Sequence, residues 1–197
     1  MNIAFFDFDG TITKQDSLFL FVRFAVGRKR LYLGLLSKFW VLLGYMCGLY
    51  SNTYAKQELM RYFFGGLKQS DFLALCEAFL PTLESILKSS AIKRIQWHKN
   101  RGDEVVVVSA SFEAYLLPLC KKLGVACIGT KLESKNGILS GNIAGENCYG
   151  SQKAIRIKAK YNLAQYTKIY AYGDTKGDTQ MLLLATSDEY RFYRFFH

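Results

Sequence analysis

The chain has 197 residues, enough for one domain with or without an inserted subdomain. Half of the residues are hydrophobic and 21% are charged, which excludes an intrinsically disordered or a fibrous protein. The 26 Lys and Arg residues outnumber the 16 Asp and Glu residues, and the formal net charge of +10 favours anionic partners such as phosphate esters, acidic lipid headgroups or nucleic acid.

The first predicted element is a buried strand over 2–6 (NIAFF), which runs directly into the loop DFDGT. From residue 16 to about residue 81 the sequence is helical in character. We expect four helices there, separated by glycines and by a Ser-Asn-Thr cluster, with Thr53 and Ser70 as N-caps. Their predicted ranges are 18–26, 31–50, 54–64 and 72–80.

Beyond Pro81 helices and strands alternate, and the run VVVV is a β-branched strand of the kind that is buried on both faces of a sheet. This alternation predicts an α/β fold with a doubly wound parallel sheet. We expect a core of residues 1–15 and 82–197, with a helical-bundle cap of residues 16–81 inserted into it. The predicted elements after Pro81 are helices over 82–100, 114–123 and 151–162, strands over 104–108, 125–129 and 168–172, and a turn over 135–137.

The cysteines and histidines argue against a zinc site and a disulfide framework. None of the five cysteines forms a CxxC pair, and the chain has two histidines. The first residues also lack the pattern of a secretory signal, because Asp7 and Asp9 interrupt the segment that would have to be apolar. We therefore expect a cytoplasmic protein in a reducing compartment.

Polar residues follow three of the predicted strands, at the positions where a sheet of this type binds its ligands. The first strand leads into DFDGT, the second into Ser109, and the last into GDTKGD, which contains Asp174 and Asp178. Lys153 lies at the start of the helix between the second and the last of these. The sequence thus predicts four carboxylates and one lysine on a common rim.

Such a rim is suited to a divalent metal and a phosphate group, because Mg²⁺ prefers oxygen ligands and keeps substrate oxygens in its shell. A single Asp after a strand is usually a helix cap or a turn residue, but three such strand ends together favour a site. A calcium loop is another interpretation of DFDGT. It fails because Ile12 stands where that loop needs glycine and Leu18 stands where it needs glutamate.

These motifs resemble those of a known family. FFDFDGTIT, VVVVSASF, Lys153 and YGDTKGDTQML are similar, in this order, to the four motifs of the haloacid dehalogenase superfamily of phosphatases. The helical insert resembles the four-helix cap of the phosphoserine phosphatase-like branch. An apolar cap with Asp16 is also similar to the small-cap phosphatidylglycerophosphate phosphatases. The resemblance covers nearly the whole chain and implies a Rossmann-like core carrying that cap.

Residue by residue, the resemblance implies that Asp7 is the nucleophile and forms an aspartyl-phosphate. Asp9 would protonate the leaving oxygen and then deprotonate the hydrolytic water. The resemblance also implies Mg²⁺ as cofactor. Its ligands would be the Asp7 carboxylate, the backbone carbonyl of Asp9, Asp174, and Asp178 directly or through water.

The phosphoryl oxygens would be bound by hydroxyl, ammonium and backbone N–H groups. Lys153 has the alternative of being a solvated helix residue, but its spacing before the last motif favours a catalytic position. The groups implied are Thr11, Ser109, the backbone at Ala110, and Lys153.

Two positions depart from the phosphoserine phosphatase pattern. Gly-Gly commonly follows the motif-two serine there, whereas this chain has Ala110-Ser111. The cap glutamate that holds the substrate ammonium is replaced by Asp16, one methylene shorter. Lys56 and Arg61 are candidates for the cap arginine that binds a substrate carboxylate. These departures argue against phosphoserine as the substrate.

The segment 31–50 is long enough to span a bilayer and carries one charge, Lys38. A single crossing would separate the first motif from the others, so three interpretations remain: a helix inside the cap, an interfacial helix, or a re-entrant hairpin. The basic run 28–30 and the amphipathic rings of the segment would suit anionic headgroups. Residues 190–196 are aromatic and basic, and we favour an edge strand there over a membrane contact.

We therefore expect a Mg²⁺-dependent phosphomonoester hydrolase acting on a lipid phosphate such as phosphatidylglycerophosphate. The alternatives are a soluble phosphoserine phosphatase-like enzyme, and a catalytically silent membrane-peripheral or partner-binding module. Expected partners are a phosphorylated small molecule or a lipid headgroup, at the inner face of the cytoplasmic membrane. We expect no nucleic acid, because the basic residues do not interleave with aromatic residues along a core strand.

Overall fold

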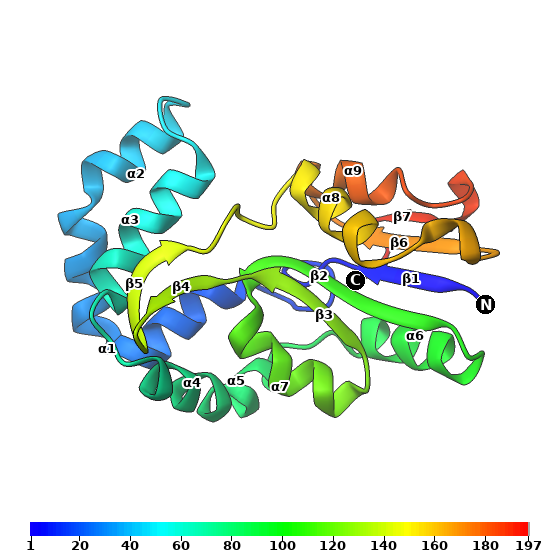
Figure 1. The fold of residues 1–197 in the computed structure, drawn as a ribbon, viewed down its shortest axis with the longest axis horizontal. Helices are drawn as coiled ribbons and strands as arrows, with labels where there is room; N and C mark the ends of the chain where they lie inside the picture. Colours follow the sequence, from blue (N-terminus) through cyan, green and yellow to red (C-terminus); the bar gives the residue numbers. More distant parts are fainter. Residues whose placement is uncertain (197) are drawn as a thin grey trace.

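The computed structural model describes residues 1–196 and contains a five-stranded sheet in the order β3-β2-β1-β6-β7 (Figure 1). All neighbouring strands are parallel, which confirms the predicted α/β fold. The chain steps from β1 through β2 to β3 on one side and places β6 and β7 on the other. The strands are β1 (Ile3–Phe6), β2 (Glu104–Phe112), β3 (Ala126–Thr130), β6 (Ile169–Gly173) and β7 (Arg191–Tyr193).

Helices cover both faces of this sheet, because alternate residues of its strands are apolar on opposite sides. Ala4 and Phe6 pack in the larger apolar cluster with α6 and α7, whereas Ile3 and Phe5 pack in a second cluster with α8 and α9. The helices on this part of the chain are α5 (Leu80–Ser85), α6 (Ser89–Asn100), α7 (Glu113–Leu123), α8 (Ser151–Lys160) and α9 (Thr179–Leu182).

The helical insert lies beyond one end of the sheet (Figure 1). Phe21 of α1 stacks on Tyr115 of α7, with ring centroids 4.7 Å apart, and its edge meets Phe79. The insert thus shares one apolar core with the α7 side of the sheet. Its helices are α1 (Ser17–Ser37), α2 (Phe39–Met46), α3 (Asn52–Phe64) and α4 (Gln69–Ala78).

The single helix predicted over 31–50 is wrong. α1 continues through a kink at Gly27, where φ is +77°, and α2 begins after Lys38. The hydroxyl of Ser37 donates to the carbonyl oxygen of Gly34 at 2.9 Å, which closes the last turn of α1. An apolar pattern does not reveal such a break, because side chains on both sides of it are equally hydrophobic.

The helix predicted over 82–100 is also wrong, because α5 and α6 are separate. Between them Leu87 bridges to Thr13, and the N–H of Lys88 donates to the carbonyl of Ile12 at 2.8 Å. The backbone here bonds to the loop after β1 instead of continuing a helix. These bonds anchor that loop to the start of α6.

The two predicted N-caps are each displaced by two residues. Ser51, not Thr53, caps α3 by accepting the N–H of Tyr54 at 3.1 Å. Lys68 precedes α4, so Ser70 lies inside that helix. Both predictions identified the correct cluster of polar residues and the wrong member of it.

An antiparallel hairpin extends from the sheet toward the insert (Figure 1). The predicted turn is confirmed at Asn136 and Gly137, which both have positive φ, as a two-residue hairpin turn requires. The N–H of Ile143 donates to Oε1 of Gln57 in α3 at 3.0 Å, so this hairpin packs against the insert. Its strands are β4 (Leu132–Lys135) and β5 (Ile138–Ile143).

Two features bear on membrane contact. β7 lies at the edge of the sheet beside β6, which confirms the predicted edge strand. Among the helices described for residues 1–196, none has the combined length and apolar character needed to cross a bilayer.

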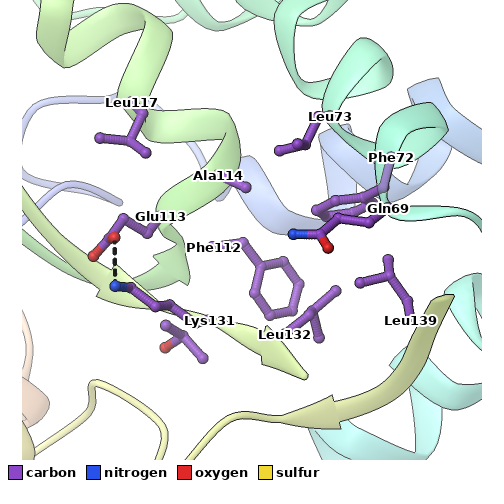
Figure 2. Close-up of a pocket in the computed structure, with 11 residues that line it drawn as sticks. Gln69, Phe72, Leu73, Phe112, Glu113, Ala114, Leu117, Lys131, Leu132 and Leu139 are labelled. Atoms are coloured by element: carbon purple, nitrogen blue, oxygen red, sulfur yellow. Dashed lines mark ion pairs between the residues drawn. The ribbon is translucent and has the colours of Figure 1, made fainter. Parts of the chain in front are cut away.

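A hollow of about 190 Å³ lies where α4, α7 and the hairpin meet (Figure 2). Phe72, Phe112 and Leu139 form its apolar walls. The carboxylate at its rim, Glu113, pairs with Lys131 at 3.1 Å. None of the sequence-predicted site residues lines this hollow, so the chemistry must lie elsewhere.

Candidate active site

The polar strand ends meet where the strand order reverses, next to β1. Phe6 pairs with Val107 of β2 and with Tyr172 of β6, so the residues after β1 and β6 lie at a similar height to the second half of β2. β2 continues to Phe112, beyond the predicted end at residue 108, so Ser109 lies within the strand. The N–H of Asp7 donates to the carbonyl of Tyr172 at 2.9 Å, which holds Asp7 beside the end of β6. A reversal of this kind leaves a crevice in which α/β proteins bind ligands.

Three carboxylates gather in this crevice. Oxygen atoms of Asp7, Asp174 and Asp178 all lie within 4.8 Å of one another. Thr11 donates its hydroxyl to Asp174 at 3.1 Å. Gly10 has φ of +79°, and a Cβ there would lie 2.2 Å from an oxygen of Asp174, so the loop after β1 packs directly on this carboxylate.

Lys153 of α8 reaches into the cluster from the second face of the sheet. Its buried ammonium donates to Asp7 and to Asp178, the latter at 2.6 Å. Burial would lower the pKa of Lys153, but the two carboxylates outweigh burial and raise it. The interpretation of Lys153 as a solvated helix residue is therefore wrong.

The carboxylates respond differently to their surroundings. Burial raises the pKa of Asp7, against the lowering effect of the Lys153 ammonium. Burial also acts on Asp178, but Lys153 and the donors of Thr175 outweigh it and lower the pKa of Asp178. The Lys153 ammonium contacts Asp7 and Asp178, and Asp174 lies beside them, so the ionised cluster of three carboxylates and one ammonium carries an excess of two negative charges. An oxygen-only donor set with that excess fits a divalent cation such as Mg²⁺.

Asp9 is in the same loop but faces away from this cluster. The N–H of Ser17 donates to its Oδ1 at 2.7 Å, and the hydroxyl of Ser111 donates to its Oδ2 at 2.5 Å. Burial raises the pKa of Asp9, and the Asp16 carboxylate adds to this effect. The side chain of Asp9 is not part of the three-carboxylate group, which is consistent with a role for its backbone carbonyl in metal binding.

A cavity of about 350 Å³ joins these groups to the helical insert. The loops after β1 and β6, the end of β2 and Lys153 of α8 contribute to its polar floor, and α1, α2 and α3 form its apolar wall. The floor includes Asp7, Asp9, Asp16, Ser109, Ala110, Ser111, Lys153, Thr175 and Asp178. The wall includes Leu18, Phe19, Leu42, Tyr45, Ala55 and Leu59.

The remaining predicted phosphate-binding residues occupy different positions. The buried Ser109 faces the cavity and accepts the N–H of Ser111 at 2.9 Å. Asp16 caps α1 by accepting the N–H groups of Leu18 and Phe19, and it also borders the cavity. Thr11 is buried behind Asp174 and is absent from the cavity lining.

Lys56 is the most unusual cation of the cavity. It is 8% exposed and donates to the carbonyl of Ala110 at 2.5 Å and to Asn147 at 3.2 Å. The ion pairs found within residues 1–196 do not include Lys56. Burial lowers its pKa to about 8. Arg61, the other candidate, pairs with Glu58 outside the cavity.

Sequence reasoning missed Asn147, Ser17 and Ser111 as site residues. Asn147 bonds to Lys56 from the loop before α8, and no motif marks that loop. Ser111 was noted as a departure from Gly-Gly, which could have signalled a new hydrogen-bond donor. These contacts depend on how the insert folds back over the sheet.

Residues 4–183 match the family model of the haloacid dehalogenase-like hydrolases. The chain belongs to this hydrolase family. The predicted superfamily and the predicted enzyme class, a phosphatase, are both confirmed. The finer likeness to phosphatidylglycerophosphate phosphatases stays a prediction.

Among curated proteins, the hydrolase is similar to protein CicA of Caulobacter vibrioides, with 33% identity over 96% of this chain and 85% of that protein. It is also similar to a histidinol-phosphatase of Neisseria meningitidis, with 29% identity over 68% of this chain and 58% of that protein. The first match runs along nearly the whole chain, and the second covers part of each protein.

Solved structures share its fold. A protein of unknown function from Bordetella pertussis has a TM-score of 0.78 and 21% identity, covering 94% of this chain and 87% of that one. A phospho-aspartyl intermediate analogue of phosphoserine phosphatase has a TM-score of 0.64 and 21% identity, covering 93% and 83%. At these identities the likeness establishes the common fold.

Proposed function

We propose that this hydrolase cleaves phosphomonoesters through an aspartyl-phosphate on Asp7. The observation that carries the proposal is the cluster of Asp7, Asp174 and Asp178, in which the Lys153 ammonium bonds to Asp7 and Asp178. Asp7, Lys153 and Asp178 lie at the floor of a cavity. A buried carboxylate next to a cation and open to a cavity can act as a nucleophile on an anionic ester. The family of the chain and its phosphatase relatives support this chemistry.

The first half of the reaction forms the covalent intermediate. A carboxylate oxygen of Asp7 forms a bond to phosphorus, and the bond from phosphorus to the ester oxygen breaks. Asp9 gives its proton to the departing oxygen, so the leaving group departs as an alcohol. The raised pKa of Asp9 suits a group that must hold this proton beforehand.

The second half returns the enzyme to its starting state. Asp9, now a carboxylate, takes a proton from water while the water oxygen forms a bond to phosphorus. The bond between phosphorus and Asp7 breaks, inorganic phosphate leaves, and Asp9 is again protonated. Lys153, Ser109 and the backbone at Ala110 hold the phosphoryl oxygens during both halves.

The three carboxylates and the backbone carbonyl of Asp9 would hold Mg²⁺. When bound, Mg²⁺ supplies neutralisation of charge on the phosphoryl oxygens. Asp178 also accepts the N–H groups of Asp174 and Thr175, at 3.2 Å and 2.9 Å, so its own orientation is set by the loop after β6. Thr11 orients Asp174 in the same way.

The rest of the cavity indicates which ester fits. Lys56 is a buried cation without a carboxylate partner among the described residues, so a second anionic group of the substrate would compensate it. The apolar wall, which includes Phe19 and Leu42, suits a hydrocarbon portion. A lipid phosphomonoester such as phosphatidylglycerophosphate has both features, because a phosphodiester anion and acyl chains accompany its terminal phosphate.

Phosphoserine is the second candidate. Its carboxylate would meet Lys56 and its ammonium would meet Asp16, which also borders the cavity. This substrate would leave the apolar wall uncovered, and for that reason we rank it below the lipid ester.

Phosphate release from a panel of esters tests the proposal. Phosphatidylglycerophosphate in mixed micelles, phosphoserine and histidinol phosphate are compared with and without Mg²⁺, using the parent chain and Asp7→Asn. We expect Mg²⁺-dependent release that Asp7→Asn abolishes, with the lipid ester as the best substrate. Undiminished release by Asp7→Asn contradicts the mechanism. No release from any ester would instead favour a silent binding module.

A further inference from the structure

The first part of the insert is rich in positive charge. Between residues 17 and 57 the chain has six basic residues and no Asp or Glu. Arg23, Arg28 and Lys29 are exposed among them. Lys56 is buried in the cavity and Lys38 pairs with Glu58 at 2.9 Å, so the cationic surface consists of Arg23, Arg28, Lys29 and Arg30.

The same segment carries a large exposed apolar surface. Leu36 is 72% exposed, Trp40 76%, Met46 81% and Leu49 77%. In α2, whose sequence is FWVLLGYM, Gly44 is the single fully buried residue. The second half of α1 and the whole of α2 form the outer edge of the insert, on the side away from the sheet (Figure 1). We call this surface, residues 28–50, the outer edge.

α2 packs on the protein through Gly44 and the half-buried Val41 and Leu42, and its other side chains are exposed. Such a helix needs a further partner, because soluble proteins rarely leave this much apolar surface in water. A second copy of the chain would satisfy the apolar side chains. It would also bring two sets of Arg28 and Lys29 toward each other, with no acidic residue in the segment to separate them. Like charges at such an interface oppose association.

We propose that the outer edge docks on an anionic lipid bilayer. Trp40, Met46 and Leu49 would enter the region between headgroups and acyl chains, where aromatic and aliphatic side chains are favoured. Arg28 and Lys29 would meet the anionic headgroups. Because α2 has eight residues, it lies in the interface and does not cross the bilayer.

Docking in this way also brings the catalytic cavity to the lipid. Phe19 and Tyr45 are 50% and 41% exposed, and both line the cavity. The rim of the cavity is therefore continuous with the apolar surface of α2. This second step, delivery of a lipid ester to Asp7, rests on the proposed function, whereas docking itself does not.

Vesicle flotation tests the docking without any turnover. The full chain is mixed with vesicles of phosphatidylcholine, or of equimolar phosphatidylcholine and phosphatidylglycerol. We expect flotation with the anionic vesicles. The variant Arg28→Gln with Lys29→Gln should bind them about tenfold more weakly or worse, as expected for two charges near an anionic surface. The variant Trp40→Ser with Met46→Ser should weaken binding to the anionic vesicles by a similar factor.

Matched controls change the same residue types elsewhere. Lys121→Gln with Lys158→Gln removes two exposed charges, and Leu117→Ser with Ile155→Ser removes two exposed apolar groups. Both should float like the parent chain, and so should Asp7→Asn, even if no ester is ever hydrolysed. Circular dichroism confirms that each variant is folded.

Three results would overturn the proposal. They are absence of flotation by the parent chain, equal flotation of the outer-edge and control variants, and a stable dimer in light scattering that Trp40→Ser with Met46→Ser dissociates. The last of these would assign the outer edge to a second copy of the chain.

Discussion

The hydroxyl of Ser111 donates a hydrogen bond to Oδ2 of Asp9 at 2.5 Å. The other oxygen of Asp9 accepts the backbone N–H of Ser17, which can donate but cannot accept. When Asp9 is protonated, the proton therefore resides on Oδ2, because a hydroxyl can turn and accept it. Ser17 bonds to both Ser111 and Tyr115, so Asp9 is held from both the sheet and the insert.

Ser111→Ala should weaken catalysis in a substrate-dependent way. Without the hydroxyl the Asp9 carboxyl loses one of its two hydrogen bonds, and proton transfer to the leaving oxygen becomes less efficient. We expect kcat for an alkyl phosphate to fall about 10- to 100-fold, below the full value of general acid catalysis. For p-nitrophenyl phosphate, whose leaving group needs no proton, kcat should change little. Steady-state kinetics on both esters measure this difference.

Ser85→Ala, at an exposed hydroxyl in α5, is the control and should leave both rates unchanged. Ser111→Thr keeps the donor and should recover part of the alkyl phosphate rate. Equal losses on both esters would mean that Ser111 supports the fold and not the acid.

Lys56→Met should raise KM for esters that carry an anionic group besides the scissile phosphate. In the proposed complex the Lys56 ammonium attracts the second anionic group of the substrate. The variant loses this attraction, and esters without a second anionic group are not affected. We expect about a tenfold increase in KM for phosphoserine or phosphatidylglycerophosphate, and little change for p-nitrophenyl phosphate, in line with charged hydrogen bonds. Lys68→Gln, an exposed lysine of the same insert, is the control.

The same lysine predicts a pH dependence of KM. Because burial lowers the pKa of Lys56 to about 8, the ammonium is present below that pH and is lost above it. In the parent chain, KM for an ester with a second anionic group should therefore rise as the pH increases through about 8. In Lys56→Met the KM should not change across this range. A parallel rise in both chains would assign the titration to another group.

His98 should make folding sensitive to acid. It is fully buried, bonded to Asp103 at 2.8 Å and to the Tyr172 hydroxyl at 3.0 Å. Burial lowers its pKa from 6.5 to about 4, against the raising effect of Asp103. Between these values the unfolded chain binds a proton that the native chain does not, so the free energy of unfolding decreases as the pH falls from 6.5 to about 4.

Urea unfolding of the parent chain and of His98→Gln measures this effect. The parent should lose about 3 kcal/mol more than the variant over that interval, because each pKa unit corresponds to about 1.4 kcal/mol. The variant starts less stable at neutral pH, since it loses the bonds to Asp103 and Tyr172. Identical pH dependence in both chains would show that His98 does not titrate on unfolding.

Gly10→Ala should damage the metal site. A Cβ at this position would lie 2.2 Å from an oxygen of Asp174, in a backbone conformation that residues other than glycine rarely adopt. We expect the Mg²⁺ concentration for half-maximal activity to rise about tenfold or more, at a stability cost of about 1–3 kcal/mol. Titration of activity with Mg²⁺, together with thermal unfolding, measures both quantities.

Gly102→Ala distinguishes the effect of backbone strain from the effect of the collision with Asp174. Gly102 has a similar φ of +74° and nothing within 4 Å of an added Cβ, so it carries the backbone strain without the collision. It should be destabilised to a similar extent and keep the parent's Mg²⁺ dependence. Loss of Mg²⁺ response in both variants would point to a general loosening of the fold.

The chemistry-bearing residues could be predicted because they follow short-range rules. Asp7 and Asp174 come directly after apolar strands, and parallel strands end at a common edge, so local patterns were enough to bring the two together. Lys153 was found in the same way, from its place at the start of a helix. The register of β1 with β2 and β6 then aligned these residues as expected.

Helix ends and the outer half of the site could not be predicted with the same rules. The break between α1 and α2 lies at Lys38, whose backbone is non-helical with φ of −104° and ψ of 15°. The gap before α6 depends on backbone bonds to the loop after β1. Neither the break at Lys38 nor the gap before α6 is visible in the hydrophobic periodicity of the sequence. Long apolar segments therefore looked continuous when they were not.

The amino-acid order alone established the parallel α/β core and the family motifs, and it predicted the carboxylates of the proposed reaction, because each depends on the local alternation of apolar strands and polar loops. Tertiary structure decided that Ser111 and Ser17 hold Asp9, that Lys56 is buried in the cavity, and that α2 exposes its apolar side chains. These properties arise where the insert packs over the sheet, and contacts between segments far apart in the chain are set by packing, not by local pattern.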